Sequence, residues 1–221
     1  MLAPYLCFQC LDDFIAVQSP ICPRCGMMFA GRFDEDHLCG DCLKHRKQFN
    51  RARSAGVYAG PLLKLIHRLK YHGRAELARP LGKLIYHTYT RHWETGEIDW
   101  VVPVPLHIRK RRRRGFNQAH LMVAKWPLYH RPENDGGPID IKIDILQRVR
   151  FTIPQTGLGQ RERQQNIKGA FGLKDPSQIQ NRSKLLVDDV FTTGATVAEC
   201  ARILRAGGAE RVDVLTLARA I

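Results

Sequence analysis

An acidic pair followed by a loop of small hydroxyl residues carries the clearest chemistry in this sequence. The apolar residues 185–187 run directly into Asp188 and Asp189, and a stretch with helical spacing follows at residues 196–205. The loop between them reads Thr192, Thr193, Gly194, Ala195 and Thr196. Backbone N–H groups, hydroxyls and the N-terminus of a helix together form a site suited to a phosphate monoester.

The two carboxylates predict what the phosphate belongs to. Asp188 and Asp189 would repel a phosphate that they touched, so we expect them to face sugar hydroxyls or a hydrated Mg²⁺. Phosphate, diol and metal together indicate a phosphorylated ribose. The structural alternative is a helix-capping turn with threonines for solubility, but the apolar strand before the pair favours the ligand site. No Walker A or Gly-x-Gly-x-x-Gly motif occurs, so nothing supports an ATPase or a dehydrogenase.

Three Cys-x-x-Cys pairs lie within residues 7–42. In a reducing compartment such pairs are metal ligands or redox groups rather than disulfides, and a redox pair or unrelated thiols would not explain three pairs in one short segment. The second and third pairs, separated by thirteen residues, have the spacing of the two knuckles of a zinc ribbon. The predicted zinc ligands are Cys22, Cys25, Cys39 and Cys42.

The first pair, Cys7 and Cys10, supplies half of a further metal site. A fourth pair missing upstream, His37, or a partner protein would be needed to complete it. The seventh cysteine, Cys200, stands in a stretch with helical spacing, and we expect it to be a packed core thiol.

The chain is strongly basic, with 35 Lys and Arg against 21 Asp and Glu and a formal charge of +14. An excess of this size favours attraction to a polyanion. Six consecutive cations stand out: Arg109, Lys110, Arg111, Arg112, Arg113 and Arg114. Such a run can neutralise several phosphates of a nucleic acid, whereas the alternatives are a solvated loop or helix start, or cations that serve only a pyrophosphate. We expect Tyr58, Phe116 and Phe151 in the core rather than as platforms for bases.

The remaining pattern predicts an α/β domain behind a small module. At 221 residues and 44% hydrophobic content the chain can bury a core, but residues 1–50 show little apolar periodicity and need a staple such as zinc. We therefore expect a cysteine-rich zinc-ribbon module at 1–50 and a main domain at 51–221 that opens with two helices. The expected helices are 62–69, 75–92, 116–126 and 196–205; the expected strands are 100–105, 139–145 (an edge strand after a loop at 131–140), 184–190 and 211–217.

Strand, helix and strand from residue 184 onwards form a βαβ unit, which implies a parallel sheet. No apolar run approaches the about 20 residues that a membrane span needs. The N-terminal residues also lack the basic region and apolar core of a signal peptide. We therefore expect a cytoplasmic protein without membrane insertion.

The acidic pair and its loop, at residues 186–196, resemble the signature for phosphoribosyl pyrophosphate (PRPP) of the type I phosphoribosyltransferases. Residues 69–73 (Leu-Lys-Tyr-His-Gly), 102–106 (Val-Pro-Val-Pro-Leu) and 114–119 (Arg-Gly-Phe-Asn-Gln-Ala) further resemble one branch, the ComF/GntX family of competence and DNA-utilisation proteins. The resemblance spans essentially the whole chain, including the cysteine pairs. It departs in one respect, because related members often carry four pairs; either Cys7 and Cys10 are an orphan half-site or Met1 is not the natural start.

The resemblance implies a type I phosphoribosyltransferase fold, a central parallel sheet flanked by helices, with a small N-terminal zinc ribbon. It implies that the catalytic residues Asp188 and Asp189 contact the ribose hydroxyls and Mg²⁺, and that residues 192–196 hold the 5′-phosphate. The pyrophosphate loop would be residues 103–107, with Val104, Pro105 and Leu106 at its centre. Residues 155–171 suit a mobile cationic lid. Candidate cations for the leaving pyrophosphate are Lys70, Arg109, Arg161 and Arg163.

Two functions therefore compete. In the first, the protein is a PRPP-dependent transferase or phosphoribosyl-binding protein with Mg²⁺ and structural Zn²⁺, acting in the uptake and use of DNA. In the second, it is a non-catalytic protein of the transformation machinery that binds single-stranded DNA through residues 109–114 and contacts other competence proteins. No residue stands out as a general base, and one sequence does not define the acceptor.

Overall fold

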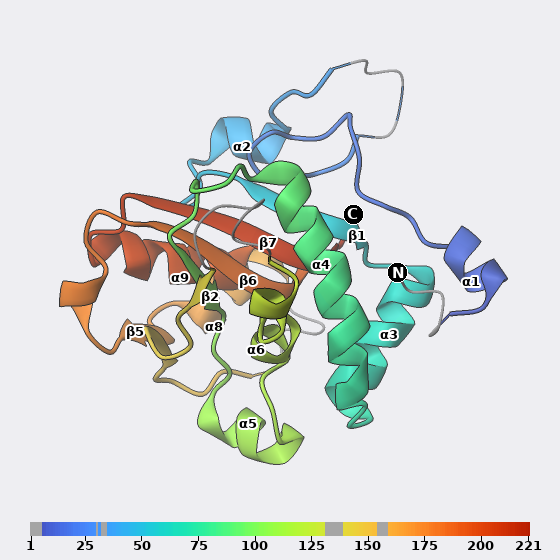
Figure 1. Ribbon diagram of the computed structural model, residues 1–221. Coiled ribbons are helices and arrows are strands. Elements are labelled where there is room, and N and C mark those ends of the chain that lie inside the picture. The colour runs from blue at the N-terminus through green and yellow to red at the C-terminus, as the bar shows by residue number, and fades with distance from the viewer. Residues whose placement is uncertain (1–5, 30, 32–34, 131–138, 154–158) are drawn as a thin grey trace.

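A five-stranded sheet forms the centre of the protein (Figure 1). The computed structural model describes residues 6–29, 31, 35–130, 139–153 and 159–221. All pairings in this sheet are parallel, and the strand order is β1-β7-β6-β2-β3. The strands are β1 (Ala52–Val57), β2 (Trp100–Pro103), β3 (Asp140–Ile141), β6 (Ser183–Phe191) and β7 (Arg211–Arg219). The predicted α/β class with a parallel central sheet is confirmed.

Helices cover both faces of the sheet. On one face α3 (Gly60–Tyr71), α4 (Ala78–His92) and α6 (Gln118–Val123) pack through one apolar cluster, and on the other α9 (Ala195–Ala206) packs through a second. In Figure 1, α4 crosses in front of the strands and α9 lies at the far side. The helices predicted near 62–69, 75–92 and 196–205 are therefore confirmed, and the one predicted at 116–126 is shorter.

β1 corrects the prediction that two helices open the main domain. Apart from Val57, its residues lack the β-branched and aromatic side chains that favour strands, so the local pattern gave little strand signal. Burial of β1 against β7 stabilises the strand in place of intrinsic strand propensity. Its Ser54 also shares a 2.6 Å hydrogen bond with Thr216.

The edge strand predicted at 139–145 is wrong beyond its start. Only β3 (Asp140–Ile141) pairs with β2, and residues 146–148 form β4 (Leu146–Arg148), which pairs antiparallel with β5 (Phe171–Leu173) in a separate ribbon. The loop expected at 131–140 lies outside the described residues except for its last two positions.

Smaller elements complete the fold. They are the helices α1 (Phe8–Asp12), α2 (Gly40–Lys44), α5 (Ile108–Arg114) and α8 (Gln160–Ile167), and the 3₁₀ turns Ala75–Leu77, Trp126–Leu128 and Pro176–Gln178. Along the described residues, none of the helices combines the length and the apolar character that crossing a membrane would require.

In Figure 1, the part of the cysteine-rich segment around α2 lies at the top, α1 lies at the right, and α5 lies at the bottom. The main chain of this segment is hydrogen-bonded to β1: Ala52 N–H donates to the Arg24 carbonyl at 2.7 Å, and Val57 N–H donates to the Ile15 carbonyl at 2.8 Å. The segment is thus attached along the length of β1, and the domain boundary at residue 50 stays a prediction.

Candidate functional site

The acidic pair lies near the carboxyl end of β6, as its sequence position predicts. Both carboxylates are half-buried. The Asp188 carboxylate accepts a hydrogen bond from the Asp189 N–H at 2.8 Å. The ammonium of Lys70, from the last turn of α3, is 2.8 Å from Asp189 Oδ1. One of the predicted cations therefore already pairs with the predicted acids.

The charges of Asp188, Asp189 and Lys70 affect one another. Burial, followed by the neighbouring charge of Asp189, raises the pKa of Asp188 to about 7. Although burial opposes the charge of Lys70, the Asp189 carboxylate beside it raises the pKa of that lysine. Only one ammonium forms an ion pair with the two carboxylates, so their remaining oxygen atoms could bind a divalent cation or hydroxyl donors. Oxygen donors of this kind fit Mg²⁺.

The loop after β6 turns directly into α9. Gly194 has φ of +75°, a conformation that favours glycine, and a Cβ at this position would lie 2.5 Å from the ring of Phe191. α9 then begins at Ala195, whose N–H lies 3.4 Å from the Thr193 hydroxyl. The predicted phosphate residues 192–196 thus form a tight turn at the N-terminus of a 12-residue helix, where backbone N–H groups favour an anion.

The predicted pyrophosphate loop lies beside the acidic pair. β2 pairs with β6 so that Pro103 is opposite Val187, and the Val104 N–H donates to the Val187 carbonyl at 2.8 Å. Asn117 holds the loop from the other side, because its Nδ2 donates to the Val104 carbonyl at 3.0 Å. Val104 is buried, and Pro105 and Leu106 are half-buried.

The basic run forms α5 and divides into two faces. Lys110 and Arg114, one helical turn apart, are half-buried, whereas the four other cations are exposed: Arg109, Arg111, Arg112 and Arg113. Burial and the charge of Arg148 lower the pKa of Lys110 to about 8. Burial lowers the pKa of Arg114, which the charge of Asp189 opposes. Arg114, on the inner face of α5, is therefore close enough to the acidic pair for Asp189 to affect its pKa.

Phe151 corrects a prediction, because its side chain is not in the core. It is 42% exposed and meets the ring of His107 edge to face at 5.3 Å. The charged groups of Arg109 and Lys110 lie 5.5 and 5.8 Å from its ring. Tyr71, also exposed, lies under Arg114 at 5.6 Å. Aromatic rings thus accompany the cations of α5.

The four cysteines predicted as zinc ligands gather into one cluster. Their sulfur atoms all lie within 4.8 Å of one another, and the sulfurs of Cys25 and Cys39 are 3.6 Å apart. A tetrahedral ion with bonds of about 2.3 Å to sulfur needs sulfurs separated by about 3.8 Å. Burial raises the pKa of Cys25 to about 11, so a thiolate in this position needs a cation. Geometry and chemistry both fit a metal ion.

Cys7 and Cys10 do not join this cluster within the described part of the chain. They lie at the start of α1, which packs near α3. The His37 ring stacks on Phe29 at 3.9 Å. Cys200 on α9 is fully buried, as predicted for a core thiol.

A cavity of about 990 Å³ separates the cysteine cluster from α8. Its wall includes residues 192–195 of the loop, residues 45–49 of the cysteine-rich segment, and Arg163, Lys168 and Arg219. Of the expected lid, residues 155–158 lie outside the described part, and the rest includes α8. Arg161 is exposed on α8, and the pyrophosphate role predicted for it stays a prediction.

Two functional candidates had no site role from the sequence: Arg148, which only stands at a spacing similar to that of the family, and Arg219, which was not singled out. The charge of Arg148 acts to lower the pKa of Asp188 because the β4–β5 ribbon brings this residue near the site. Arg219 ends the apolar strand β7 and is 3% exposed. An arginine directly after an apolar run was the available signal for it.

Proteins of similar sequence are named for competence and DNA utilization. The chain is 36% identical over 205 residues to DNA utilization protein YhgH of Escherichia coli K12, and 34% identical over 210 residues to Competence protein F of Haemophilus influenzae; each alignment covers 91% of this chain and 85% of the relative. Competence protein ComFC of Bacillus subtilis is 26% identical, with 97% and 84% covered. A comparison with protein-family models finds no match.

Solved structures give weaker likenesses. Glutamine PRPP amidotransferase from B. subtilis, complexed with ADP and GMP, has a TM-score of 0.41 at 18% identity, with 68% of this chain and 30% of that chain covered. Hypoxanthine-guanine phosphoribosyl transferase of L. donovani has a TM-score of 0.30 at 13% identity, with 67% and 71% covered. These values are too low to support an inference about this chain.

Replacing Asp188 by asparagine is expected to stabilise the ligand-free protein at alkaline pH. The folded chain binds more protons than the unfolded chain between pH 3.8 and about 7, so the contribution of this carboxyl to stability falls as pH rises through that window. Urea unfolding should give Asp188→Asn a free energy of unfolding on the order of 2 kcal/mol above wild type at pH 8.5, and no excess near pH 4.

Asp189→Asn is the matched control for this measurement. It removes the partner of Lys70 as well as the charge that acts on Asp188, and should therefore gain less stability at pH 8.5 than Asp188→Asn. An Asp188→Asn variant whose gain does not change between pH 4 and 8.5 would contradict the assignment of the unfavourable charge to this carboxyl.

Proposed function

Because the chain belongs to the ComF family of competence and DNA-utilization proteins, we propose that it binds PRPP or a related phosphoribosyl ligand in the handling of imported DNA. One observation carries the proposal: the acidic pair, the loop at 192–196 and the loop at 103–107 converge at the carboxyl ends of β2 and β6. Ligands of open parallel sheets bind at that edge. The convergence supplies an anion site, two carboxylates and a second loop within one region.

Each part of the ligand has a proposed partner. The 5′-phosphate binds the N-terminus of α9 through residues 192–196, and the ribose hydroxyls donate to Asp188 and Asp189. The pyrophosphate lies along residues 104–106. Mg²⁺, held with the ligand by the two carboxylates, supplies positive charge to the pyrophosphate.

The same arrangement suits the departure of pyrophosphate. As the bond from the ribose anomeric carbon to the pyrophosphate oxygen breaks, the electron pair stays on the leaving group, and an acceptor forms the new bond to that carbon. Lys110, Arg114 and Arg148 supply nearby cations that stabilise the departing charge. The cavity between the loop and the cysteine cluster offers room for an acceptor, and α8 at its rim keeps water from the sugar.

Calorimetry with PRPP and Mg²⁺ tests the sugar site. We expect the wild-type protein to bind, and Asp188→Asn/Asp189→Asn to lose at least about tenfold in affinity, because each carboxylate loses charge-assisted hydrogen bonds. Asp144→Asn, which neutralises an exposed carboxylate on the β4 side, is the control and should bind normally. No binding by the wild type would exclude the phosphoribosyl proposal.

We also propose that the four clustered cysteines hold a structural Zn²⁺. Four thiolates form the closed coordination shell of a structural rather than a catalytic site, and the segment around them has few other means of holding its shape. Elemental analysis of protein purified without chelator should give close to one zinc per chain, and Cys22→Ser should lose it. A value close to two would require that Cys7 and Cys10 also bind metal.

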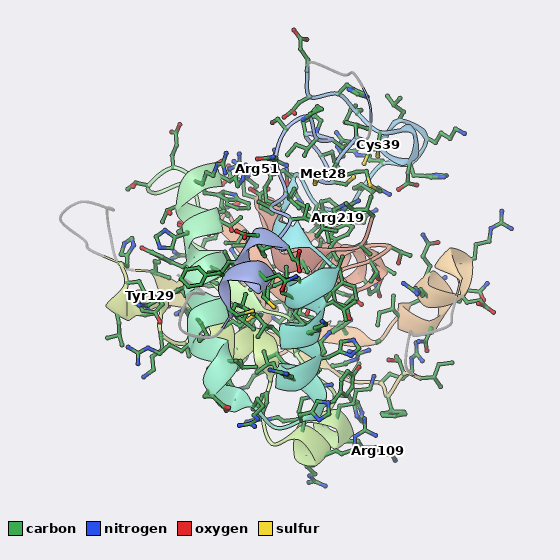
Figure 2. The ribbon with its side chains drawn as sticks, turned by 90° about the vertical axis from the view of Figure 1, so that its right-hand side faces the viewer. Met28, Cys39, Arg51, Arg109, Tyr129 and Arg219 are labelled. Atoms are coloured by element: carbon green, nitrogen blue, oxygen red, sulfur yellow. The ribbon has the colours of Figure 1, made fainter. Side chains whose placement is uncertain are left out.

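A second function, binding of single-stranded DNA, is favoured by the outer face of α5. Of its four exposed cations, Arg109 lies 5.5 Å from the exposed ring of Phe151. Cations and aromatic rings together are typical of surfaces that bind single strands, because phosphates bind the cations and bases stack on the rings. Figure 2 shows Arg109 at the opposite end of the molecule from Cys39, so this surface is distinct from the metal cluster.

Fluorescence anisotropy with an oligonucleotide of about 20 nucleotides tests the second function. Each lost phosphate contact reduces the slope of log affinity against log salt by about 0.7 for single strands, so Arg111→Gln/Arg112→Gln/Arg113→Gln should reduce it by about 2. Phe151→Ala should weaken binding by about 1–3 kcal/mol with an unchanged slope. A control with three exposed cations of α4 replaced, Arg79→Gln/Lys83→Gln/Arg91→Gln, should have a much smaller effect; equal losses would indicate attraction to net charge alone.

A further inference from the structure

The last residue of β7 links the cysteine cluster to the sheet. Arg219 is 3% exposed, and its Nη1 donates to the Cys25 carbonyl at 2.6 Å. Its Nη2 lies 3.5 Å from the Cys25 sulfur. Figure 2 shows Arg219 below Cys39, between the cysteine-rich segment and the strands. The guanidinium thus contacts a predicted metal ligand directly.

A buried guanidinium needs negative charge close by. Among the described residues no carboxylate forms an ion pair with Arg219, although several other arginines have one. The sulfurs of the cluster are the available source. Four thiolates around a divalent ion carry a net charge of about −2, so the metal-loaded cluster would satisfy the buried cation.

The opposite side of the same guanidinium reaches the phosphate loop. Arg219 Cζ lies 4.5 Å from the centre of the Phe191 ring, and the two residues are register partners in β7 and β6. Phe191 also meets Phe49 edge to face at 5.9 Å. Because a Cβ at Gly194 would lie 2.5 Å from this ring, the ring packs directly against the turn of the loop.

We propose that Arg219 is a positioning residue that couples metal binding at the four cysteines to ligand binding at residues 192–196. The inference rests on the proposed phosphoribosyl and zinc sites. When the metal-bound sulfurs hold Arg219, the guanidinium fixes the Phe191 ring, and the ring fixes the turn at Gly194 whose N–H groups receive the phosphate. Loss of the metal removes the charge that holds the guanidinium, so the loop loses its support.

Coupling of this kind is reciprocal. If the metal raises the affinity for the ligand by some factor, the ligand must raise the affinity for the metal by the same factor. The wild-type protein therefore tests the proposal without any substitution. Zinc affinity is measured by competition with a chromophoric chelator, with and without saturating PRPP and Mg²⁺, and we expect PRPP to raise it about fivefold or more, within the usual range of such couplings.

Variants locate the coupling in the Arg219 contact. Arg219→Met should abolish the effect of PRPP on zinc affinity, and Arg219→Lys should retain part of it because the charge remains. Phe191→Leu should leave zinc affinity without PRPP unchanged and remove the increase caused by PRPP. Arg24→Met removes a cation between two of the ligands and is the control, which should keep the coupling.

The outcomes separate the two proposals. If zinc-loaded wild type does not bind PRPP in calorimetry, the phosphoribosyl function is wrong. If it binds PRPP but its zinc affinity is the same with and without PRPP, the function stands and the coupling is wrong. Loss of ligand affinity in Arg219→Met with the reciprocal effect intact would mean that Arg219 contacts the ligand itself, which also contradicts the coupling. The wild-type comparison decides even if Arg219→Met does not fold.

Discussion

Two adjacent carboxylates near the end of a buried strand impose the charge arrangement of this protein. Asp188 and Asp189 lie near the end of β6, where burial and the neighbouring carboxylate make the negative charge of Asp188 costly. Cations from separate elements face them: Lys70 from α3, Arg114 from α5 and Arg148 from β4. The helix after β2 and the ribbon β4–β5 thereby supply charge to the same edge of the sheet. Elements far apart in sequence meet there because all five central strands end on one side.

Cations that contribute to the net charge of +14 therefore lie in two different environments on α5. Two of them are half-buried on the inner face of α5, where burial lowers the pKa of Lys110 and Arg114 and the charge of Asp189 acts on Arg114. Four other cations remain in water on the outer face of α5, where salt sets the distance over which their charge acts. A single helix of seven residues carries both the half-buried and the exposed cations, because residues four apart share a face and their neighbours do not.

Structural elements that depend on contiguous residues could be predicted from the sequence. Elements that depend on contacts between distant residues could not. The strand, loop and helix around residues 184–205 follow from local pattern, and the clustering of four cysteines follows from their spacing. β1 was not predicted because its Ala, Ser and Gly residues have no preference for strands. They form a strand because they are buried against β7. Phe151 was wrongly assigned to the core, since its exposure depends on how the segment after β4 meets His107.

The metal cluster and the loop at residues 192–196 belong to one apolar core, which is why the cysteine-rich segment is more than an appendage. Cys22, Cys25 and Cys42 share a continuous buried cluster with Phe191 and Ala195. Close-packed protein interiors transmit strain from one group to the next. A segment of this length with so few apolar side chains cannot hold its own shape, so the ion that would fix it also fixes one wall of the core. Under the coupling proposed above, the order of the loop at residues 192–196 would then depend on an ion that does not touch it.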